Sequence, residues 1–382
     1  MMVNNLITRE NARINTLLNK HVKTLPHYVD EYVRSKLRAG LSNKTLLQYV
    51  YKYIHFFDWL ISENIVEASE RRDIPYTELE KLKKEDIELY IDHLKFENIS
   101  NFKNTVKQRG SSDILTFINA LRALFKYLTV ETEKDNGECY FYRNVMNKVV
   151  FNKQRETANK RARKINAHIL SSSEEIAGLL NFIKEDYEYQ ISAQQKERFR
   201  RDKERDIAII SLILGSGIRV NEVASLELKN VNLKKNIIDV TRKGNKEDSV
   251  MIMDQAREDL EAYLRVRNER YRKASECPFV FVTIYQRQAK EISKRAIQKL
   301  VTKYTAAFNN NSGISPQKLR HSFATDYIKN NGNIVTLRDQ LGHSDIKTTS
   351  LYTNMSNEDN IKTLNIMNEH RNASMQETDK NE

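Results

Sequence analysis

The sequence predicts a mainly α-helical protein with a small β-sheet, divided into a helical N-terminal unit and a mixed α+β C-terminal unit. Only 10 glycines and 4 prolines occur in 382 residues, which argues against a loop-rich or all-β chain. Amphipathic helical patterns fill the first part of the chain, whereas strand patterns occur only in the second part. A chain of this length exceeds one ordinary hydrophobic core and fits two domains.

Two long helices are predicted in the N-terminal unit. Leu46–Ile65 and Ile114–Glu131 repeat apolar residues at three- and four-residue spacing, as amphipathic helices do. The aromatic residues of the first helix are expected in the core. Thr77, Ser111 and Ser112 stand where helix N-caps are expected.

The C-terminal unit is expected to open with a serine N-cap in SSSEEIAGLL and to continue with a helix at Glu204–Ile218 that ends at glycines. Ile237–Arg242 and Ser249–Met253 have the pattern of two strands around a polar turn. Cys277–Ile284 is a further apolar run of strand character. These elements predict a small sheet among helices.

Basic residues outnumber acidic ones, 63 against 51, and give a formal net charge of +12, which favours a polyanionic partner such as nucleic acid. Composition shifts at Asn152–Lys164, a stretch with almost no apolar side chain, which predicts a cationic linker between the domains. Its basic residues are candidates for DNA contact: Lys153, Arg155, Lys160, Arg161, Arg163 and Lys164.

Cys139 and Cys277 have no metal-ligand spacing, so neither a disulfide nor a zinc framework is expected, and they suit a reducing cytosol. The N-terminus has no apolar signal-peptide core, and the longest apolar run, Ile207–Leu214, is too short to cross a membrane. We therefore expect a cytoplasmic protein that does not act in a membrane.

Four stretches of the C-terminal unit carry groups suited to phosphate chemistry. They are GSGIRVNEV with Arg219, TRKGNKEDS with Lys243, ISPQKLRHSFAT with Arg320, and LGHSDIKTTSLYTN with His343 and Tyr352. Two guanidinium groups can hold the oxygens of an anionic phosphodiester without losing their charge. Each of these residues alone is commonplace, and the order of all of them is not.

Together, in this order, the stretches resemble the catalytic domain of the tyrosine recombinases, the phage integrase family. The surrounding residues match as well, in G-x-R-x-x-E from Gly217 to Glu222, in K-G-x-K from Lys243, in L-R-H-S-F-A-T, and in L-G-H-S with a tyrosine nine residues after the histidine. YFYRNVM and ERDIAII are further similar to the single-recombinase Xer proteins of the XerS type. The resemblance implies a helical core-binding (SAM-like) bundle followed by the family's catalytic domain.

The domain boundaries are therefore expected as a tail or single helix at 1–24, a core-binding DNA-binding domain at 25–150, a basic linker at 151–168, a catalytic domain at 169–356, and a docking helix with a polar tail at 357–382. In the family, the segment after the nucleophile docks onto a neighbouring protomer.

The resemblance also implies the reaction, in which DNA is cut and rejoined through a 3′-phosphotyrosine. Tyr352 is then the nucleophile, and Lys243 the general acid that protonates the leaving 5′-oxygen. His343 is expected to hydrogen-bond the scissile phosphate beside the two arginines, and Glu222 to orient these groups. A covalent intermediate keeps the bond energy, so no metal ion and no other cofactor is expected.

Gln317 departs from the family, which usually has a histidine three residues before the second arginine. An amide can donate a hydrogen bond to a phosphate oxygen but carries no proton or charge there. His321 follows Arg320 directly and is not expected to replace that histidine, because adjacent helical residues point in different directions. Gln317 therefore stays among the candidate catalytic residues with an altered role.

The resemblance implies a double-stranded DNA recombination site as partner, a homotetramer on paired sites, and a DNA translocase of the FtsK type. Resolution of chromosome dimers at a dif-like site is the preferred role, because residues 1–24 are too short for an additional DNA-binding domain. The integrase or transposase of a mobile element, a catalytically weakened DNA-binding protein and a type IB topoisomerase are the alternatives.

Overall fold

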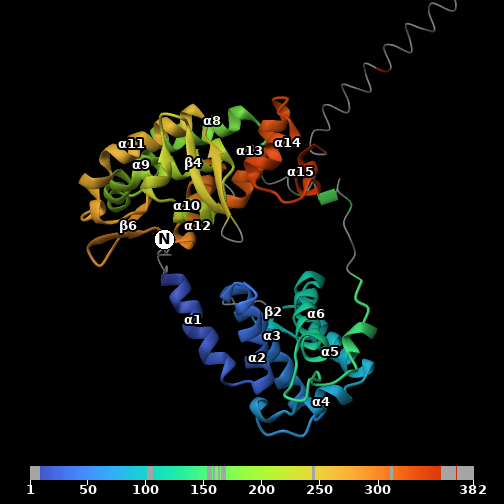
Figure 1. Ribbon diagram of the computed structural model, residues 1–382. Coiled ribbons are helices and arrows are strands. Elements are labelled where there is room, and N and C mark those ends of the chain that lie inside the picture. The colour runs from blue at the N-terminus through green and yellow to red at the C-terminus, as the bar shows by residue number, and fades with distance from the viewer. Residues whose placement is uncertain are drawn as a thin grey trace, which may run out of the picture. The chain divides into compact units, whose positions relative to one another are not determined.

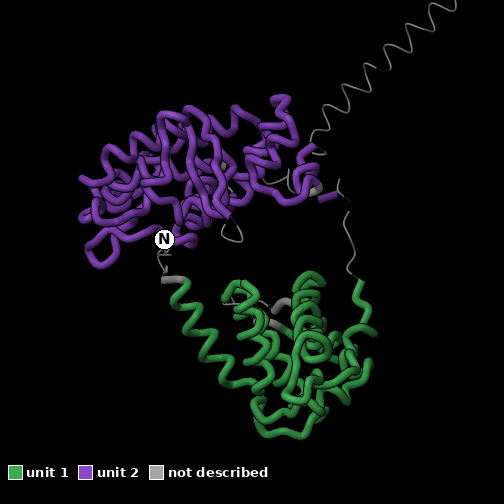
Figure 2. The backbone as a smooth tube through the Cα atoms, in the orientation of Figure 1, with its two compact units in different colours: residues 1–155 green, residues 156–382 purple. Residues whose placement is uncertain are grey.

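The computed structural model describes residues 9–100, 106–152, 157, 160–161, 164, 169–242, 246–309, 313–353 and 367. The chain forms two compact units, residues 1–155 and 156–382, coloured separately in Figure 2. Both units are mainly helical, and the strands form small antiparallel sheets, which confirms the predicted fold class. Among the described residues, no helix is both long and apolar enough to cross a membrane.

The first unit is a helical bundle (Figure 1). Its helices are α1 (Arg9–Val22), α2 (His27–Arg38), α3 (Asn43–Ser62), α4 (Tyr76–Lys81), α5 (Lys84–Phe96) and α6 (Ser111–Lys126), which continues as a π-helical turn over Tyr127–Glu131. Short 3₁₀ turns occur at Arg71–Asp73 and Val145–Lys148, and β1 (Ile99–Ser100) pairs with β2 (Val106–Lys107).

Helix α3 supplies much of the core of this unit. Its buried side chains include Phe56 and Trp59, so the aromatic residues are core residues as expected. The Tyr53 hydroxyl donates to the Ala120 carbonyl of α6 at 2.9 Å and satisfies a polar atom within the core. Both predicted long helices are therefore confirmed.

The predicted N-caps of this unit are wrong. Thr77 lies inside α4, which begins after Pro75, and Ser111 and Ser112 are the first two residues of α6, which begins after Gly110. Proline has a fixed φ and glycine has no side chain, so both can hold an extended backbone ahead of a helix without a hydroxyl cap. Ser172 does cap α8, where its side chain accepts from the Glu175 N–H.

The second unit surrounds the long helix α9 (Figure 1). Its helices are α8 (Ser173–Asn181), α9 (Ala193–Ser216), α10 (Val220–Ser225), α11 (Asp254–Arg270), α12 (Lys294–Asn309), α13 (Pro316–Lys329), α14 (Ile334–Leu341) and α15 (Ile346–Thr353). A π turn at Phe182–Asp186 and 3₁₀ turns at Tyr187–Gln190, Leu228–Asn230 and Ala274–Glu276 connect them. The strands are β3 (Val231–Asn232), β4 (Ile237–Arg242), β5 (Lys246–Met251), β6 (Val282–Tyr285) and β7 (Gln288–Glu291).

Strands β3, β4 and β5 form an antiparallel sheet in that order, and β6 pairs with β7. Strand β4 has the predicted bounds, whereas β5 begins at Lys246, three residues before the predicted start, because pairing with β4 continues to the turn. The expected strand at Cys277–Ile284 is a strand only from Val282 on, and Phe279 makes a single bridge to Glu227.

Helix α9 is fully buried over its last three turns and packs against α11 and α13. A separate small core lies among α13, α14 and α15 and comprises Ile169, Phe323, Ala324, Leu337, Leu341, Leu351 and Tyr352. We call it the C-terminal core. It holds the predicted nucleophile.

Candidate active site

Glu222 joins two arginines from different elements. Arg219 precedes α10, and its backbone N–H donates to Glu222 Oε2 at 2.8 Å while its Nη1 donates to Oε1 at 3.0 Å. Arg242, the last described residue of β4 before the turn, donates from Nη1 to Oε2 at 3.0 Å. The Glu222 carboxylate is 4% exposed, and a buried carboxylate needs such partners. It therefore fixes Arg219 relative to the sheet.

Two glycines end helices beside these arginines and give them carbonyl acceptors. Gly217 ends α9 at φ +68°, and its carbonyl accepts from Arg320 Nη1 at 2.5 Å. Gly342 ends α14 at φ +61°, and its carbonyl accepts from Arg219 Nη2 at 3.1 Å. Glycine suits both positions because a positive φ is strained for other residues.

Space also requires glycine at Gly342. A Cβ there would lie 2.6 Å from Arg242 Nε and 2.7 Å from its Cζ, closer than van der Waals contact allows. The Gly342 backbone thus lies against the guanidinium of Arg242, which also donates from Nη2 to the Gln340 carbonyl at 2.9 Å. The glycine of the L-G-H-S motif is a packing requirement of the site.

Arg320 is 1% exposed, and its two terminal nitrogens are held by the protein. Nη1 donates to Gly217, and Nη2 donates to the Leu341 carbonyl at 2.7 Å and lies 3.0 Å from His343 Nε2. Its Nε is buried without a hydrogen-bond partner among the described residues. Burial and the neighbouring Arg219 charge lower the pKa of Arg320 to about 9, so the group stays charged at neutral pH.

His343 follows Gly342 directly, and both of its ring nitrogens are engaged. Nε2 faces the donating Arg320 Nη2 and must accept, and Nδ1 lies 3.0 Å from Thr349 Oγ1 in α15. Burial and the charges of Arg320 and Arg219 lower the pKa of His343 to about 4. The imidazole is therefore neutral at pH 7, with the proton on Nδ1.

Tyr352 lies in α15, and its side chain is 2% exposed. Burial raises the pKa of its hydroxyl to about 12, although the charges of Arg320, Arg161 and Arg219 favour the phenolate. The effect of burial is larger than that of the three cations, so the hydroxyl keeps its proton at neutral pH. The hydroxyl lies 2.7 Å from Nδ1 of His321 in α13.

The structure thus brings together four of the predicted catalytic residues and the predicted orienting residue Glu222 in one region of the second unit. The four are Arg219, Arg320, His343 and Tyr352. Gln317 lies one turn from Arg320 on α13 and is exposed, and no hydrogen bond of its side chain to the described residues is found. Lys243 lies outside the described residues, as do Lys153, Arg155 and Arg163 of the linker.

The described linker residues Lys160, Arg161 and Lys164 are all exposed. Arg161 belongs to the second unit, and its charge is close enough to Tyr352 and His321 to alter the pKa of both. Part of the predicted cationic stretch therefore lies near the predicted nucleophile, Tyr352.

Sequence reasoning missed two residues of this site. Arg242 could have been found from the alternation of β4, because it has the same inward phase as Ile238 and Val240. His321 was rejected as a substitute for the family's histidine on the phosphate side of the site. The structure instead brings it to the hydroxyl of Tyr352, across the interface of α13 and α15.

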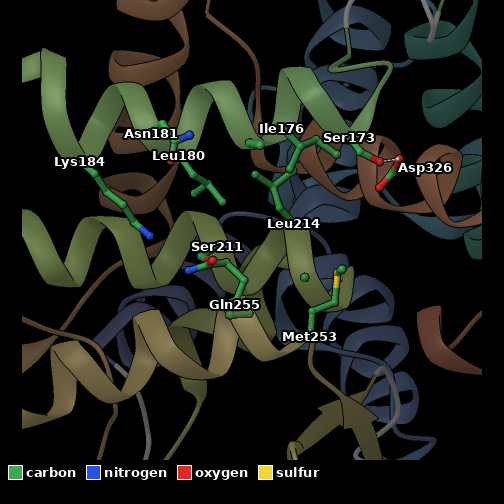
Figure 3. A pocket seen from close by; sticks show the side chains of 13 residues that line it. Ser173, Ile176, Leu180, Asn181, Lys184, Ser211, Leu214, Met253, Gln255 and Asp326 are labelled. Carbon is green, nitrogen blue, oxygen red and sulfur yellow. Dashed lines mark hydrogen bonds between the residues drawn. The ribbon is translucent and has the colours of Figure 1, made fainter.

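Two cavities in the second unit lie outside this group of residues. One of about 210 Å³ lies among α8, α9 and α11, where Ile176, Leu180, Leu214 and Met253 line it and Ser173 donates to Asp326 at its edge (Figure 3). The other, of about 480 Å³, has a charged lining that includes Arg205 and Asp206, which pair with each other. Neither lining includes a predicted site residue.

In the described part of the first unit, His55, His93 and Glu97 form one cluster with metal-ligating atoms. Two of the three side chains already have hydrogen-bond partners, because His55 bonds Tyr90 and Glu97, and Glu97 also accepts from Arg109 at 2.8 Å. His93 lies against the rings of His55 and Trp59. His55, Glu97 and Arg109 thus form a hydrogen-bonded ion-pair network of the bundle.

Residues 181–359 match the model of the phage integrase family. Tyrosine recombinase XerS of Streptococcus equi subsp. equi (strain 4047) is 39% identical over 349 residues, which cover 91% of this chain and 97% of that protein. Tyrosine recombinase XerS of Streptococcus pneumoniae (strain Hungary19A-6) is 38% identical over 350 residues, covering 92% and 98%.

The fold is similar to a solved structure of XerH site-specific recombinase bound to palindromic difH substrate, a post-cleavage complex. The TM-score is 0.59 at 18% sequence identity, and the match covers 85% of this chain and 80% of that one. At this identity the likeness concerns the fold alone.

Proposed function

The chain belongs to the phage integrase family of tyrosine recombinases, and we propose that it resolves chromosome dimers by site-specific recombination at a dif-like DNA site. The observation that carries the proposal is the convergence of Arg219, Arg320, His343 and Tyr352, in a chain similar to XerS recombinases over nearly its whole length. Phosphoryl transfer to a tyrosine needs cations and a nucleophile on one phosphate, and this group supplies both.

In the proposed reaction, Tyr352 attacks the scissile phosphate and forms a 3′-phosphotyrosine. Arg219 and Arg320 hold the non-bridging oxygens, and the buried unpartnered Nε of Arg320 supports this role because it is a donor without an acceptor. His343 lies beside Arg320 and supplies a further hydrogen bond to the phosphate once its Nε2 carries a proton and no longer accepts from Arg320. Lys243 protonates the leaving 5′-oxygen.

Glu222 orients Arg219, and this role is supported by the two bonds between them. Gln317, on the first turn of α13, donates an amide hydrogen bond toward the phosphate. A metal ion or other cofactor has no step in this reaction, since the tyrosine keeps the phosphate bond energy.

Double-stranded DNA is the proposed partner of both units. The bundle at 25–150 and the linker at 151–168 hold the duplex, with the basic linker residues near its phosphates, and the net charge of +12 supports this. Four copies assemble on two paired sites through the segment 357–382, which docks on a neighbouring copy. A DNA translocase of the FtsK type brings the sites together, and the reaction takes place in the cytoplasm, where bacterial chromosomal DNA lies.

The test uses a supercoiled plasmid with two direct copies of the short, imperfectly palindromic element closest to the gene. The wild-type protein is expected to delete the intervening DNA and, on a nicked duplex with the same element, to leave a covalent protein–DNA adduct on a denaturing gel. Tyr352→Phe is expected to bind the element and form no adduct.

If the protein relaxes plasmids without sequence preference, its activity is that of a topoisomerase and not of a recombinase. An adduct that persists in Tyr352→Phe would assign the attack to another residue. Specific binding by the wild type without any adduct would leave only a DNA-binding protein on this fold.

A further inference from the structure

His321 makes the one hydrogen bond found for the hydroxyl of Tyr352 within the described residues. Nδ1 of the imidazole lies 2.7 Å from the hydroxyl oxygen, and the two ring centroids are 5.6 Å apart at an interplanar angle of 49°. The two residues come from α13 and α15, which pack against each other. A contact of this length is a full hydrogen bond.

We propose that His321 is a catalytic residue, which accepts the phenolic proton of Tyr352 as the hydroxyl attacks the scissile phosphate. The proposal rests on the function proposed above. It concerns the proton that the nucleophile loses. Gln317 cannot accept this proton, because an amide does not ionise.

The charge states of the pair agree with this direction of transfer. Burial, followed by the charges of Arg320, Arg161 and Lys318, lowers the pKa of His321 to about 4, so at pH 7 the imidazole is neutral. Tyr352, with its raised pKa, keeps its proton in the free protein. The hydroxyl therefore donates and Nδ1 accepts, which is the arrangement of a nucleophile and its general base.

The other candidate side chains, His343 and Gln317, do not compete for the role of proton acceptor. His343 uses Nε2 for Arg320 and Nδ1 for Thr349, so neither nitrogen faces Tyr352. Gln317 is exposed on the first turn of α13. Of the described side chains, His321 is the ionisable group that contacts the reacting oxygen.

A bound phosphate makes the transfer more favourable. The groups that act on His321 are Arg320 and Lys318 of α13, Arg161 of the linker, Tyr352 of α15, and His343, whose own pKa is lowered by His321. The anionic phosphate offsets the charges of Arg320 and Arg161, which raises the basicity of His321. The phenolic proton becomes more acidic at the same time, as the Tyr352 oxygen begins to bond to phosphorus.

The step balances in atoms and charge. The bond from the Tyr352 oxygen to phosphorus forms and the bond from phosphorus to the 5′-oxygen breaks. The phenolic proton moves to Nδ1 of His321, and the 5′-oxygen takes its proton from the general acid, proposed as Lys243. In the rejoining step the protonated His321 returns the proton to the departing Tyr352 oxygen.

The test variant is His321→Asn, because the asparagine amide oxygen can occupy the position of Nδ1 and accept the same hydrogen bond without taking up a proton. We expect single-turnover adduct formation on the nicked duplex to slow by about 10²–10⁴-fold, the range of general-base catalysis, with unchanged specific DNA binding. A bond that only positions Tyr352 would leave the rate nearly unchanged. If His321→Asn does not fold, His321→Gln replaces it in the same assay.

The pH profile provides a readout that a structural role would not move. Protonation removes the lone pair of Nδ1, so the wild-type rate falls on the acidic side of the pKa of His321 in the DNA complex. His343 titrates in a similar range. The acidic limb of the pH–rate profile is therefore assigned to His321 because this limb is expected to disappear in His321→Asn. An acidic limb that remains in the variant would contradict the proposal.

A duplex with sulfur at the bridging 5′ position separates attack from departure, since a thiolate leaves without being protonated. His321→Asn should remain slow on this substrate, because its defect concerns the nucleophile. Full rescue by sulfur would assign His321 to the leaving group and overturn the proposal. If the wild type binds the site but forms no adduct, the function proposed above is wrong, and the inference on His321 is wrong with it.

Discussion

At the residue scale, Gln317 stands exposed on the first turn of α13, where the family usually has a histidine. Its amide can give the phosphate one neutral hydrogen bond, whereas a protonated imidazole gives a charge-assisted one about twice as strong. In the proposed mechanism, catalysis therefore depends more on the two arginines, Arg219 and Arg320. The proposed base His321 lies on the same helix and acts on the Tyr352 hydroxyl, whereas Gln317 is proposed to act on the phosphate.

Gln317→His should speed adduct formation by roughly several-fold to tenfold, since a difference of about 1.4 kcal/mol is a factor of ten. The gain should grow as the pH falls below the imidazole pKa, because only the protonated ring carries the extra charge, and it should vanish above that pKa. Gln317→Ala should be slower than the wild type.

The measurement is single-turnover cleavage of a nicked duplex from about pH 5.5 to 8, which brackets an ordinary imidazole titration. A histidine variant that is no faster at any pH would mean that the surrounding residues are adapted to an amide.

At the scale of elements, the active site depends on how two helices end. Gly217 and Gly342 stop α9 and α14 with a positive φ, and their carbonyls accept from Arg320 and Arg219. Each helix end thus holds an arginine that belongs to another element. The two guanidinium groups are thus positioned by backbone carbonyls at helix ends.

Gly342→Ala should therefore destabilise the second unit and reduce cleavage more strongly than binding. The positive φ alone costs about 1 kcal/mol for alanine, and the added Cβ also displaces the guanidinium of Arg242. Thermal unfolding and adduct formation measure the two effects.

Gly40→Ala is the matched control. Gly40 has φ +84° and no heavy atom within 4 Å of an added Cβ, so the variant carries the backbone strain without the collision. Equal loss of stability in both variants, with normal cleavage by Gly342→Ala, would show that the contact with Arg242 does not matter.

The sequence was sufficient to predict those helices and strands whose residue pattern is local. The spacing of apolar residues in α3 and α6 and the alternation in β4 identify these elements. The order of motifs predicted that Arg219, Arg320, His343 and Tyr352 belong to one site, and in the structure they lie in one region. Family resemblance carries spatial information that spacing lacks.

What the sequence left out depends on contacts between distant segments. The bond between His321 and Tyr352 crosses from α13 to α15, and the pairing of Arg242 with Glu222 crosses from β4 to α10. The raised pKa of Tyr352 comes from burial in the C-terminal core, which no single segment reveals. Helix starts at Tyr76 and Ser111 were missed because an extended backbone at Pro75 and Gly110 replaced a side-chain cap.

At the scale of the whole molecule, positive charge in the linker is predicted to contribute to DNA binding through phosphate contacts. Neutralising Lys160, Arg161 and Arg163 should flatten the dependence of log K on log salt concentration by about 2–3, since each lost contact changes the slope by about 0.9. Binding rather than cleavage is the proper measurement, because the Arg161 charge also acts on Tyr352.

Lys229→Gln is the control for this experiment. Lys229 already pairs with Glu227 at 2.8 Å, so its removal should leave the slope unchanged. A slope unaltered by the triple change in the linker would show that this stretch only connects the two units.

The enclosure of Tyr352 has a consequence for fidelity. A genome offers about 10⁶–10⁹ competing sites, and each of them contains phosphodiesters chemically identical to the correct one. Tyr352 is 2% exposed, so its hydroxyl meets a phosphodiester only after the residues that cover it have moved. Every 1.4 kcal/mol in the free energy of exposing Tyr352 lowers the fraction of molecules with an exposed hydroxyl about tenfold. A modest cost of exposure therefore keeps nearly all chance encounters with DNA free of strand breaks. We therefore expect cleavage only at a DNA sequence that repays this cost through its own contacts with the protein.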